Sequence, residues 1–375
     1  MALVKRRMSN LNLNLNQDKE EKESKPTDKF LQATEAKCSK DLKQLQFMHW
    51  MFTIENQLPT KRGCIKHIKR VSKTDKCHQN RKRPQFITSY YAPDKTLLIW
   101  ILGTQNTWDW TNLLNVCHKK IKLNHPSKHS IKVHNGVYNA INNLMFYAPL
   151  FADIHIHFSD PNQPIEKVVF GGHSQGGAIA QLMFMLLRGQ VECEFVEYFK
   201  EEMELTGIEL NIDCVYTVGS VHVVSHNNYG YVDNIFGSSI INIINPIDPI
   251  PMMFAGNKYE PKTPLKPSKK LSFSRVCLNK YGNAMMKNFP KIASFGPIGK
   301  FIVFVDNELR VLHRKDDKHN LFNDHLVHGA HNYTLTQKKW TDLPTLIKLQ
   351  KHHIMTTYID NLDRILKLHI NKLIE

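Results

Sequence analysis

The chain has 375 residues, of which 42% are hydrophobic, so it has enough apolar side chains for a large core and is not a disordered protein. Lysine and arginine number 50 against 34 acidic residues, and the resulting formal charge of +16 favours an anionic partner such as nucleic acid or a lipid surface. No stretch approaches the roughly 18 apolar residues of a membrane span. No apolar run follows the basic N-terminus either, so we expect an intracellular, cytoplasmic protein.

The seven cysteines are scattered and odd in number, which indicates reduced thiols rather than a disulfide framework. The one grouping with metal-like spacing is Cys64, His67, Cys77 and His78. It lacks a clean pair of two-ligand knuckles, so the sequence predicts no zinc site and no other cofactor.

The N-terminal part differs in composition from the rest. Residues 1–28 are polar and charged, which predicts a disordered tail. Residues 29–83 form a basic extension, with a predicted helix over 40–54 and a cluster of lysines and arginines over 61–83. A basic cluster favours contact with an anionic polymer or surface, although no recognised nucleic-acid-binding motif accompanies it.

Strands and helices alternate from Pro84 onwards. Strands are predicted at 86–91, 96–102, 167–170, 214–218, 240–244, 301–305 and 309–312, the last two as a hairpin around Asn307. Helices are predicted at 138–151 and 178–187. This alternation predicts an α/β fold with a mostly parallel central sheet and helices on both faces, over a domain at 84–340.

Two further segments complete the predicted organisation. Residues 254–298 contain three prolines and many lysines, which is typical of a basic insertion on the sheet. Residues 341–375 are predicted to end in an amphipathic helix, because Ile359, Leu362, Ile365, Leu366, Ile370 and Leu373 fall on one face.

The most specific motif is Gly172-His173-Ser174-Gln175-Gly176, which matches G-x-S-x-G. It follows a predicted strand and precedes a buried helix. This strand-to-helix turn strains the serine, and glycine at 172 and 176 allows the strand and helix to approach closely. The pattern predicts a nucleophilic Ser174 at the N-terminus of a helix, where negative charge is favoured.

A nucleophilic serine needs a base and an orienting acid, in the chain order Ser, Asp or Glu, then His. Asp248 follows the predicted strand 240–244, at the sheet edge where sites assemble in α/β proteins. Residues 324–333 offer His325, His328 and His331, and spacing alone does not choose among them.

The serine motif is similar to that of the class 3 (fungal-type) lipases, usually G-H-S-L-G-G-A, within the α/β-hydrolase superfamily. Other stretches resemble that family in the same order: Leu102-Gly103-Thr104 with Asp109-Trp110, Val133–Val137, Val215–Ser220, Asn245–Pro251, and His328 with Tyr333 as His-x4-Tyr. The resemblance covers residues 84–340. Leu102, Gln175, Val221 and His222 depart from the family's usual residues, so the chain resembles a divergent member.

The resemblance implies a role for each matching position. Ser174 matches the nucleophile, Asp248 the acid and His328 the base, while Thr104 and Gln175 match the two oxyanion-hole donors. It also implies hydrolysis of acylglycerols or other lipid esters, with a flap over the site at about 106–130. Phospholipid is a second expected substrate, because the basic charge suits an anionic membrane surface.

Two alternatives remain from the sequence. The chain could be a basic nucleic-acid- or membrane-binding protein built on an inactive hydrolase scaffold, although nucleic acid is disfavoured. The same triad would also serve a hydrolase of peptides or thioesters.

Overall fold

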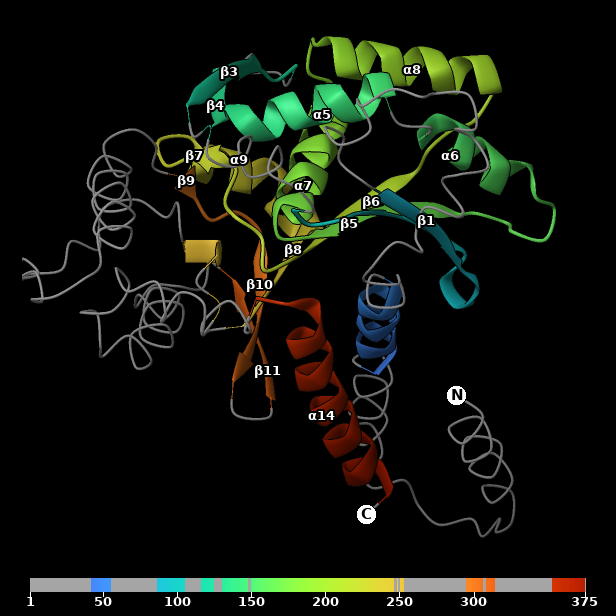
Figure 1. Cartoon of the computed structure of the whole chain (residues 1–375), viewed down its shortest axis with the longest axis vertical. Coiled ribbons are helices and arrows are strands. Elements are labelled where there is room, and N and C mark those ends of the chain that lie inside the picture. Colours follow the sequence, from blue (N-terminus) through green and yellow to red (C-terminus); the bar gives the residue numbers. More distant parts are fainter. Residues whose placement is uncertain are drawn as a thin grey trace, which may run out of the picture. The chain divides into compact units, whose positions relative to one another are not determined.

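Figure 1 shows a computed structural model of the chain. The structure describes residues 42–54, 86–104, 115, 117–124, 130–147, 150–245, 248, 250–252, 295–305, 308–313 and 353–374. The expectations for the tail 1–28, the basic cluster 61–83 and Asp109 with Trp110 lie outside these residues. The chain divides into two units, Met1–Phe47 and Met48–Glu375, and of the first only the helical residues 42–47 are described.

A seven-stranded sheet organises the second unit. Its strands are β1 (Phe86–Tyr91), β2 (Thr96–Ile101), β5 (Lys167–His173), β6 (Ile212–Val218), β8 (Ile240–Ile244), β10 (Lys300–Val305) and β11 (Glu308–His313), in the order β1-β2-β5-β6-β8-β10-β11. The pairs from β2 to β10 are parallel, and the outermost pairs β1–β2 and β10–β11 are antiparallel. The predicted mostly parallel sheet and its terminal hairpin are therefore confirmed.

The remaining elements surround this sheet. The helices are α5 (Asn135–Tyr147), α6 (Leu150–Ser159), α7 (Gln175–Arg188), α8 (Glu194–Thr206), α9 (Tyr229–Phe236) and α14 (Met355–Ile374), with short 3₁₀ turns η2 (Ala92–Asp94), η3 (Gly237–Ser239) and η4 (Ile250–Met252). A second sheet has the order β3-β4-β7-β9, formed by β3 (His118–Lys122), β4 (Ser130–His134), β7 (Val224–Ser225) and β9 (Phe295–Gly296).

The central sheet is covered on both faces. On β2, Leu97, Ile99 and Ile101 join the core formed with α5 to α9. Leu98 and Trp100 point to the other face, since side chains alternate along a strand, and both are fully buried. In Figure 1, α14 lies across the sheet from α5, α7 and α8. The helices on both faces that the sequence predicts are therefore present.

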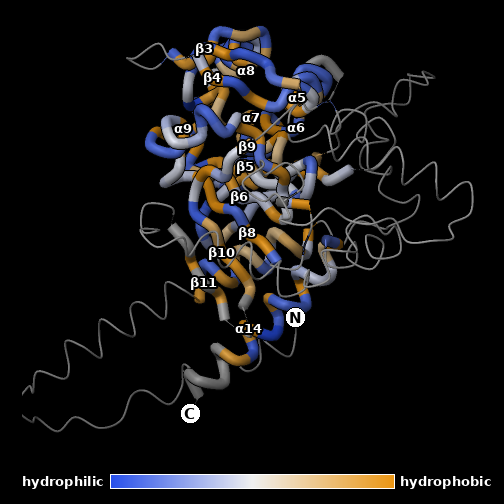
Figure 2. Tube along the Cα trace, turned by 90° about the vertical axis from the view of Figure 1, so that its left-hand side faces the viewer, coloured by the Kyte–Doolittle hydropathy of each residue, from blue (hydrophilic) through white to orange (hydrophobic). Residues whose placement is uncertain are grey.

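Helix α14 carries the apolar face expected of it. The buried side chains recur at helical spacing and are Met355, Tyr358, Ile359, Leu362 and Ile365. Figure 2 shows the same alternation of apolar and polar residues along the helix, while the strands of the central sheet are largely apolar. Burying a side chain of this size contributes about 1.5–3 kcal/mol, so this stripe is sufficient to dock the helix.

Several elements were not anticipated from the sequence. Helix α8 has an exposed face rich in glutamates, and its buried residues are only Phe195, Val196, Phe199 and Met203. Strand β3 lies within the predicted flap, and β9 lies within the predicted insertion 254–298, whose residues 254–294 are outside the described part. The predicted helix 138–151 is two helices, α5 and α6. The short strands of the second sheet are hard to predict because they depend on pairing with distant residues.

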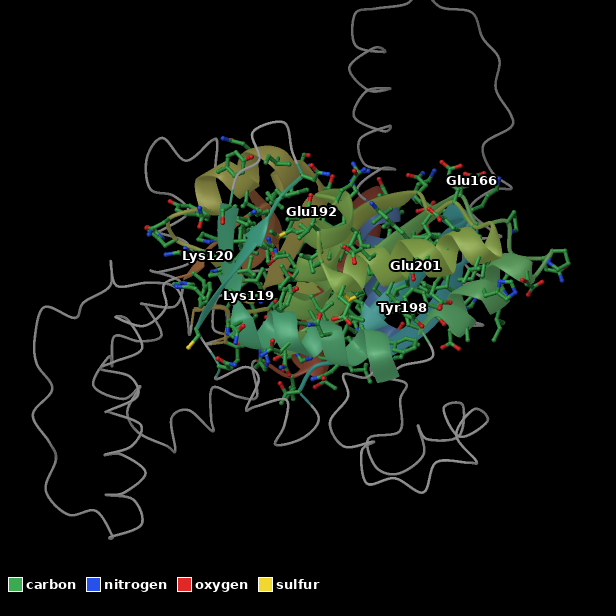
Figure 3. All side chains as sticks on the ribbon, turned by 90° about the horizontal axis from the view of Figure 1, so that it is seen from above. Lys119, Lys120, Glu166, Glu192, Tyr198 and Glu201 are labelled. Atoms are coloured by element: carbon green, nitrogen blue, oxygen red, sulfur yellow. The ribbon has the colours of Figure 1, made fainter. Side chains whose placement is uncertain are left out.

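The described surface is not uniformly basic. Figure 3 shows Lys119 and Lys120 projecting from β3, with Glu192 before α8 and Glu201 on it. These four side chains are exposed. Charged side chains on an edge strand such as β3 discourage pairing with other chains. No helix in the described ranges combines the length and the apolarity needed to cross a membrane.

His222 is buried near Phe301, with ring centroids 6.3 Å apart, and its burial lowers its pKa from 6.5 to about 4. His222 is therefore neutral in the folded protein. Between pH 6.5 and about pH 4 the unfolded chain binds more protons than the folded one. We expect the free energy of unfolding to fall by roughly 2 kcal/mol between pH 7 and pH 5 because of this group. Urea unfolding at both pH values checks this, and His222→Leu should lose less stability on acidification than the wild type.

Candidate active site

Ser174 lies at the turn between β5 and α7, with φ 56° and ψ −127°. This left-handed backbone is uncommon for a residue with a side chain and costs of order 1–3 kcal/mol. The serine is 6% exposed and directly precedes the first residue of α7. The predicted strained turn is present, and the helix N-terminus points its positive end at the serine.

The two glycines of the motif are required by close packing. A Cβ atom on Gly172 would lie 2.5 Å from the carbonyl carbon and oxygen of Gly176. A Cβ atom on Gly176 would overlap the carbonyl oxygens of Ile101 and Leu102 at the end of β2. The predicted reason for glycine at both positions is therefore confirmed.

Asp248 follows β8 in a turn in which its backbone N–H donates to the carbonyl of Asn245, at 2.9 Å. Its side chain is fully buried. The N–H of Ile250 donates to its Oδ1 at 2.9 Å, which fixes one carboxylate oxygen. The other oxygen, Oδ2, is left to face the histidine and tyrosine described next.

His353 joins the serine and the aspartate. Its Nε2 lies 2.8 Å from Ser174 Oγ, and its Nδ1 lies 2.8 Å from Asp248 Oδ2. A neutral imidazole that donates its Nδ1–H to the carboxylate can accept the serine proton at Nε2. His353 lies two residues before α14, so this helix brings the far end of the chain to the end of β5.

Tyr358, one turn into α14, completes the surroundings of the aspartate. Its hydroxyl donates to Asp248 Oδ2 at 2.6 Å and accepts the N–H of Asn245 at 3.1 Å. Burial, together with the Asp248 carboxylate, raises the pKa of Tyr358 well above its ordinary value of 10.0. The phenol therefore remains a proton donor to the carboxylate.

The backbone around His353 is also held. His173 Nε2 lies 2.7 Å from the carbonyl oxygen of His353, to which it donates, and the two rings are 4.8 Å apart between centroids. Gly219 has φ 54°, and a Cβ atom there would lie 2.6 Å from Asp248 Oδ2 and 3.1 Å from His353 Nδ1. A larger residue at 219 would displace the aspartate or the histidine.

Of the three residues expected to form a triad, Ser174 and Asp248 meet through an intervening histidine. His328, together with His325 and His331, lies outside the described residues. In the described geometry the histidine that bonds both Ser174 and Asp248 is His353, which the sequence did not single out. The signal was present in the sequence, because His-x4-Tyr occurs at His353 and Tyr358 as well as at His328 and Tyr333.

The two expected oxyanion-hole residues lie together beside the serine. The Thr104 hydroxyl donates to Gln175 Oε1 at 3.3 Å, and Gln175 is the first residue of α7. A Cβ atom on the preceding Gly103 would lie 3.3 Å from Ser174 Cβ, so the backbone at 103–104 approaches the nucleophile closely.

Among the histidines outside the triad, His134 has a structural position. It is fully buried, the N–H of Val137 donates to its Nδ1 at 3.3 Å, and its ring stacks on Phe295. It therefore supports the start of α5.

Within the described ranges, no three His, Cys, Asp or Glu side chains group so as to hold a metal ion. The sequence grouping of Cys64, His67, Cys77 and His78 lies outside those ranges. The described cysteines Cys117, Cys193 and Cys214 are free thiols.

The family model described as Lipase (class 3) matches residues 98–258, and no curated protein matches. Among solved structures, Rhizomucor miehei triacylglyceride lipase is 19% identical, with a TM-score of 0.35 over 61% of this chain and 66% of that one. A triacylglycerol lipase from Penicillium expansum is 13% identical, with a TM-score of 0.38 over 63% and 71% of the two chains.

The chain spans 55% and 66% of the lengths of two Rhizomucor miehei lipase structures, which is less than two thirds of each. The family match contains Thr104, Ser174 and Asp248 but ends before His353. The resemblance read from the sequence is confirmed over the matched residues. Residues 98–258 are thus similar to the class 3 lipases.

Proposed function

We propose that the chain is a serine hydrolase that cleaves carboxylic esters of lipids. The observation that carries this proposal is the hydrogen-bonded series Ser174–His353–Asp248, with both bonds at 2.8 Å. In this assignment Ser174 is the nucleophile, His353 the base and Asp248 the acid. The backbone N–H groups of Thr104 and Gln175 are the proposed oxyanion donors.

The proposed reaction has two stages. Ser174 Oγ attacks the ester carbonyl carbon while His353 Nε2 takes the hydroxyl proton, and Asp248 stabilises the imidazolium that forms. The tetrahedral oxyanion collapses, the bond to the alcohol breaks, and His353 returns the proton to the departing alcohol. Water then attacks the acyl-enzyme through the same base and restores Ser174. An oxyanion donor contributes about 2.7–4 kcal/mol in comparable sites.

The proposed substrate is an acylglycerol, with phospholipid as the second candidate. Support comes from the class 3 lipase match at residues 98–258 and from the formal charge of +16, which suits an anionic lipid surface. We also propose that the hydrolase domain extends beyond residue 340 to include α14. A boundary at 340 would separate His353 from Ser174.

A hydrolysis panel tests this function. Short soluble esters, long-chain acylglycerols and phospholipids are offered to the full chain, with Ser174→Ala as the control. We expect turnover of esters by the wild type, highest on acylglycerols and lowered by about 10⁴-fold or more in the variant. Turnover that survives in Ser174→Ala would reject the proposal.

The panel also separates the alternatives. Salt-sensitive retention on DNA without esterase activity would favour a basic binding protein on an inactive scaffold. Cleavage of peptides or thioesters in place of oxygen esters would keep the triad and change the substrate class.

A further inference from the structure

Residues 48–54 lie upstream of the family-matched segment 98–258 and form the last turns of the helix over 42–54. Met48, Met51 and Phe52 are fully buried. Three apolar side chains at this spacing occupy one side of a helix. The segment 48–54 is therefore packed into the fold.

Two contacts connect this segment to different elements of the second unit. The Trp50 ring lies against Tyr91 at the end of β1, with centroids 4.7 Å apart. His49 Nε2 lies 2.7 Å from Asp363 Oδ1 on α14, and both side chains are partly exposed. Such a surface pair adds little stability. It shows that α14 lies beside the segment 48–54 at Asp363.

The third contact reaches Tyr358, which is hydrogen-bonded to a triad residue. Phe52 meets the Tyr358 ring edge to face, with centroids 6.4 Å apart and the planes at 86°. The Tyr358 hydroxyl is the group that donates to Asp248 Oδ2. Phe52 is thus one side chain away from the carboxylate that orients His353.

Tyr358 is enclosed by aromatic rings on several sides. His173 and Phe304 lie 6.3 Å and 6.0 Å from its ring, between centroids. Aromatic rings in a close-packed interior keep their neighbours in one position, and a vacancy on one side allows the remaining ring to shift. His173 and Phe304 belong to strands of the central sheet, whereas Phe52 comes from neither the sheet nor α14.

We propose that residues 48–54 are a positioning element for the catalytic machinery, in which Phe52 holds Tyr358, and through it Asp248 and His353, in the reactive arrangement. This inference rests on the proposed function. A displacement of about 1 Å in a catalytic group can lower a rate by roughly 100-fold, so a loosened Tyr358 has a measurable consequence. Residues 48–54 are then part of the enzyme and not an appendage.

The first test compares two identical substitutions in the full chain. Phe52→Leu removes the ring beside Tyr358, and Phe195→Leu makes the same change at a buried site on α8, in the core with α5 and α7. Turnover of a soluble ester and the labelling rate by a fluorophosphonate are measured. Labelling joins Ser174 Oγ to phosphorus and expels fluoride, with His353 taking the serine proton. Melting temperatures report folding.

We expect Phe52→Leu to lower kcat and the labelling rate about ten-fold with little change in KM. Phe195→Leu should lower the melting temperature to a similar extent. It should change kcat and the labelling rate by less than about two-fold, because distant, independent sites affect each other by only a few tenths of a kcal/mol. Equal losses in the two variants, or wild-type rates in Phe52→Leu, would overturn the proposal.

A double-mutant cycle measures the coupling between Phe52 and the Tyr358 hydroxyl, a quantity that general destabilisation does not change. Tyr358→Phe removes the hydroxyl donor to Asp248 and keeps the ring. If Phe52 acts through that hydroxyl, Phe52→Leu costs about ten-fold in the wild type and little in the Tyr358→Phe background. Independent, multiplying effects would contradict the proposed route.

The wild-type result distinguishes failure of the proposed function from failure of the positioning role. A wild-type chain that is neither labelled by the fluorophosphonate nor active on esters would reject the serine hydrolase itself. A labelled and active wild type with an unaffected Phe52→Leu variant rejects the positioning role alone.

Discussion

Replacing His353 by alanine is expected to abolish ester hydrolysis almost as completely as replacing Ser174, while His328→Ala keeps near wild-type turnover. The reason is geometric, since His353 lies 2.8 Å from both Ser174 Oγ and Asp248 Oδ2. The nucleophile and the base act as a unit, so the loss of either costs about 10⁶-fold in kcat and the double variant is little worse than either alone. Steady-state kinetics on a soluble ester measures this.

Matched controls each remove one other imidazole. They are His352→Ala, next to His353, and His325→Ala and His331→Ala, earlier in the chain. All three should retain activity. An inactive His328→Ala chain beside an active His353→Ala chain would return the base to the segment 324–333.

Asp248→Asn is expected to lower kcat by about 10⁴-fold while the protein stays folded. The Ile250 N–H donates to Oδ1, so the asparagine oxygen remains there and the amide NH₂ takes the place of Oδ2. That NH₂ then faces the Tyr358 hydroxyl and His353 Nδ1, which both donate in the wild type. The imidazole can satisfy it only by moving its proton to Nε2, and it can then no longer accept the Ser174 proton.

The matched control is Asp233→Asn. Asp233 is likewise a buried carboxylate, and it accepts the N–H of Gly299 at 2.6 Å, outside the triad. This variant should lose stability and keep its kcat per folded molecule. An Asp248→Asn chain with nearly wild-type kcat would show that another group orients the base.

The nucleophile turn could be predicted because its cause is local. Gly172, Ser174 and Gly176 lie within five residues, and the strand before them and the helix after them follow from short apolar runs. Few backbone conformations allow so tight a turn between a strand and a helix. The five-residue motif therefore predicts both the strained φ of Ser174 and the need for glycine. Asp248 followed in the same way from its place after β8.

The acidic helix α8 and the second sheet were not predicted for a different reason. Helix α8 has few apolar positions, and β7 and β9 are strands of two residues that exist through pairing with each other and with β4. Such short strands have almost no periodicity of their own. Their positions depend on contacts between residues far apart in the chain.

The sequence by itself determined the sheet, the strained serine and the aspartate, because each depends on neighbouring residues and on regular spacing. It could not choose the base, because His-x4-Tyr occurs at both His328 and His353. Spacing along the chain does not say which histidine lies near Ser174 in the folded protein. Only the tertiary structure shows that, among the described residues, His353 is the histidine bonded to both Ser174 and Asp248. The apolar stripe of α14 docks on the sheet face opposite α7 and holds His353 next to a serine 179 residues earlier in the chain.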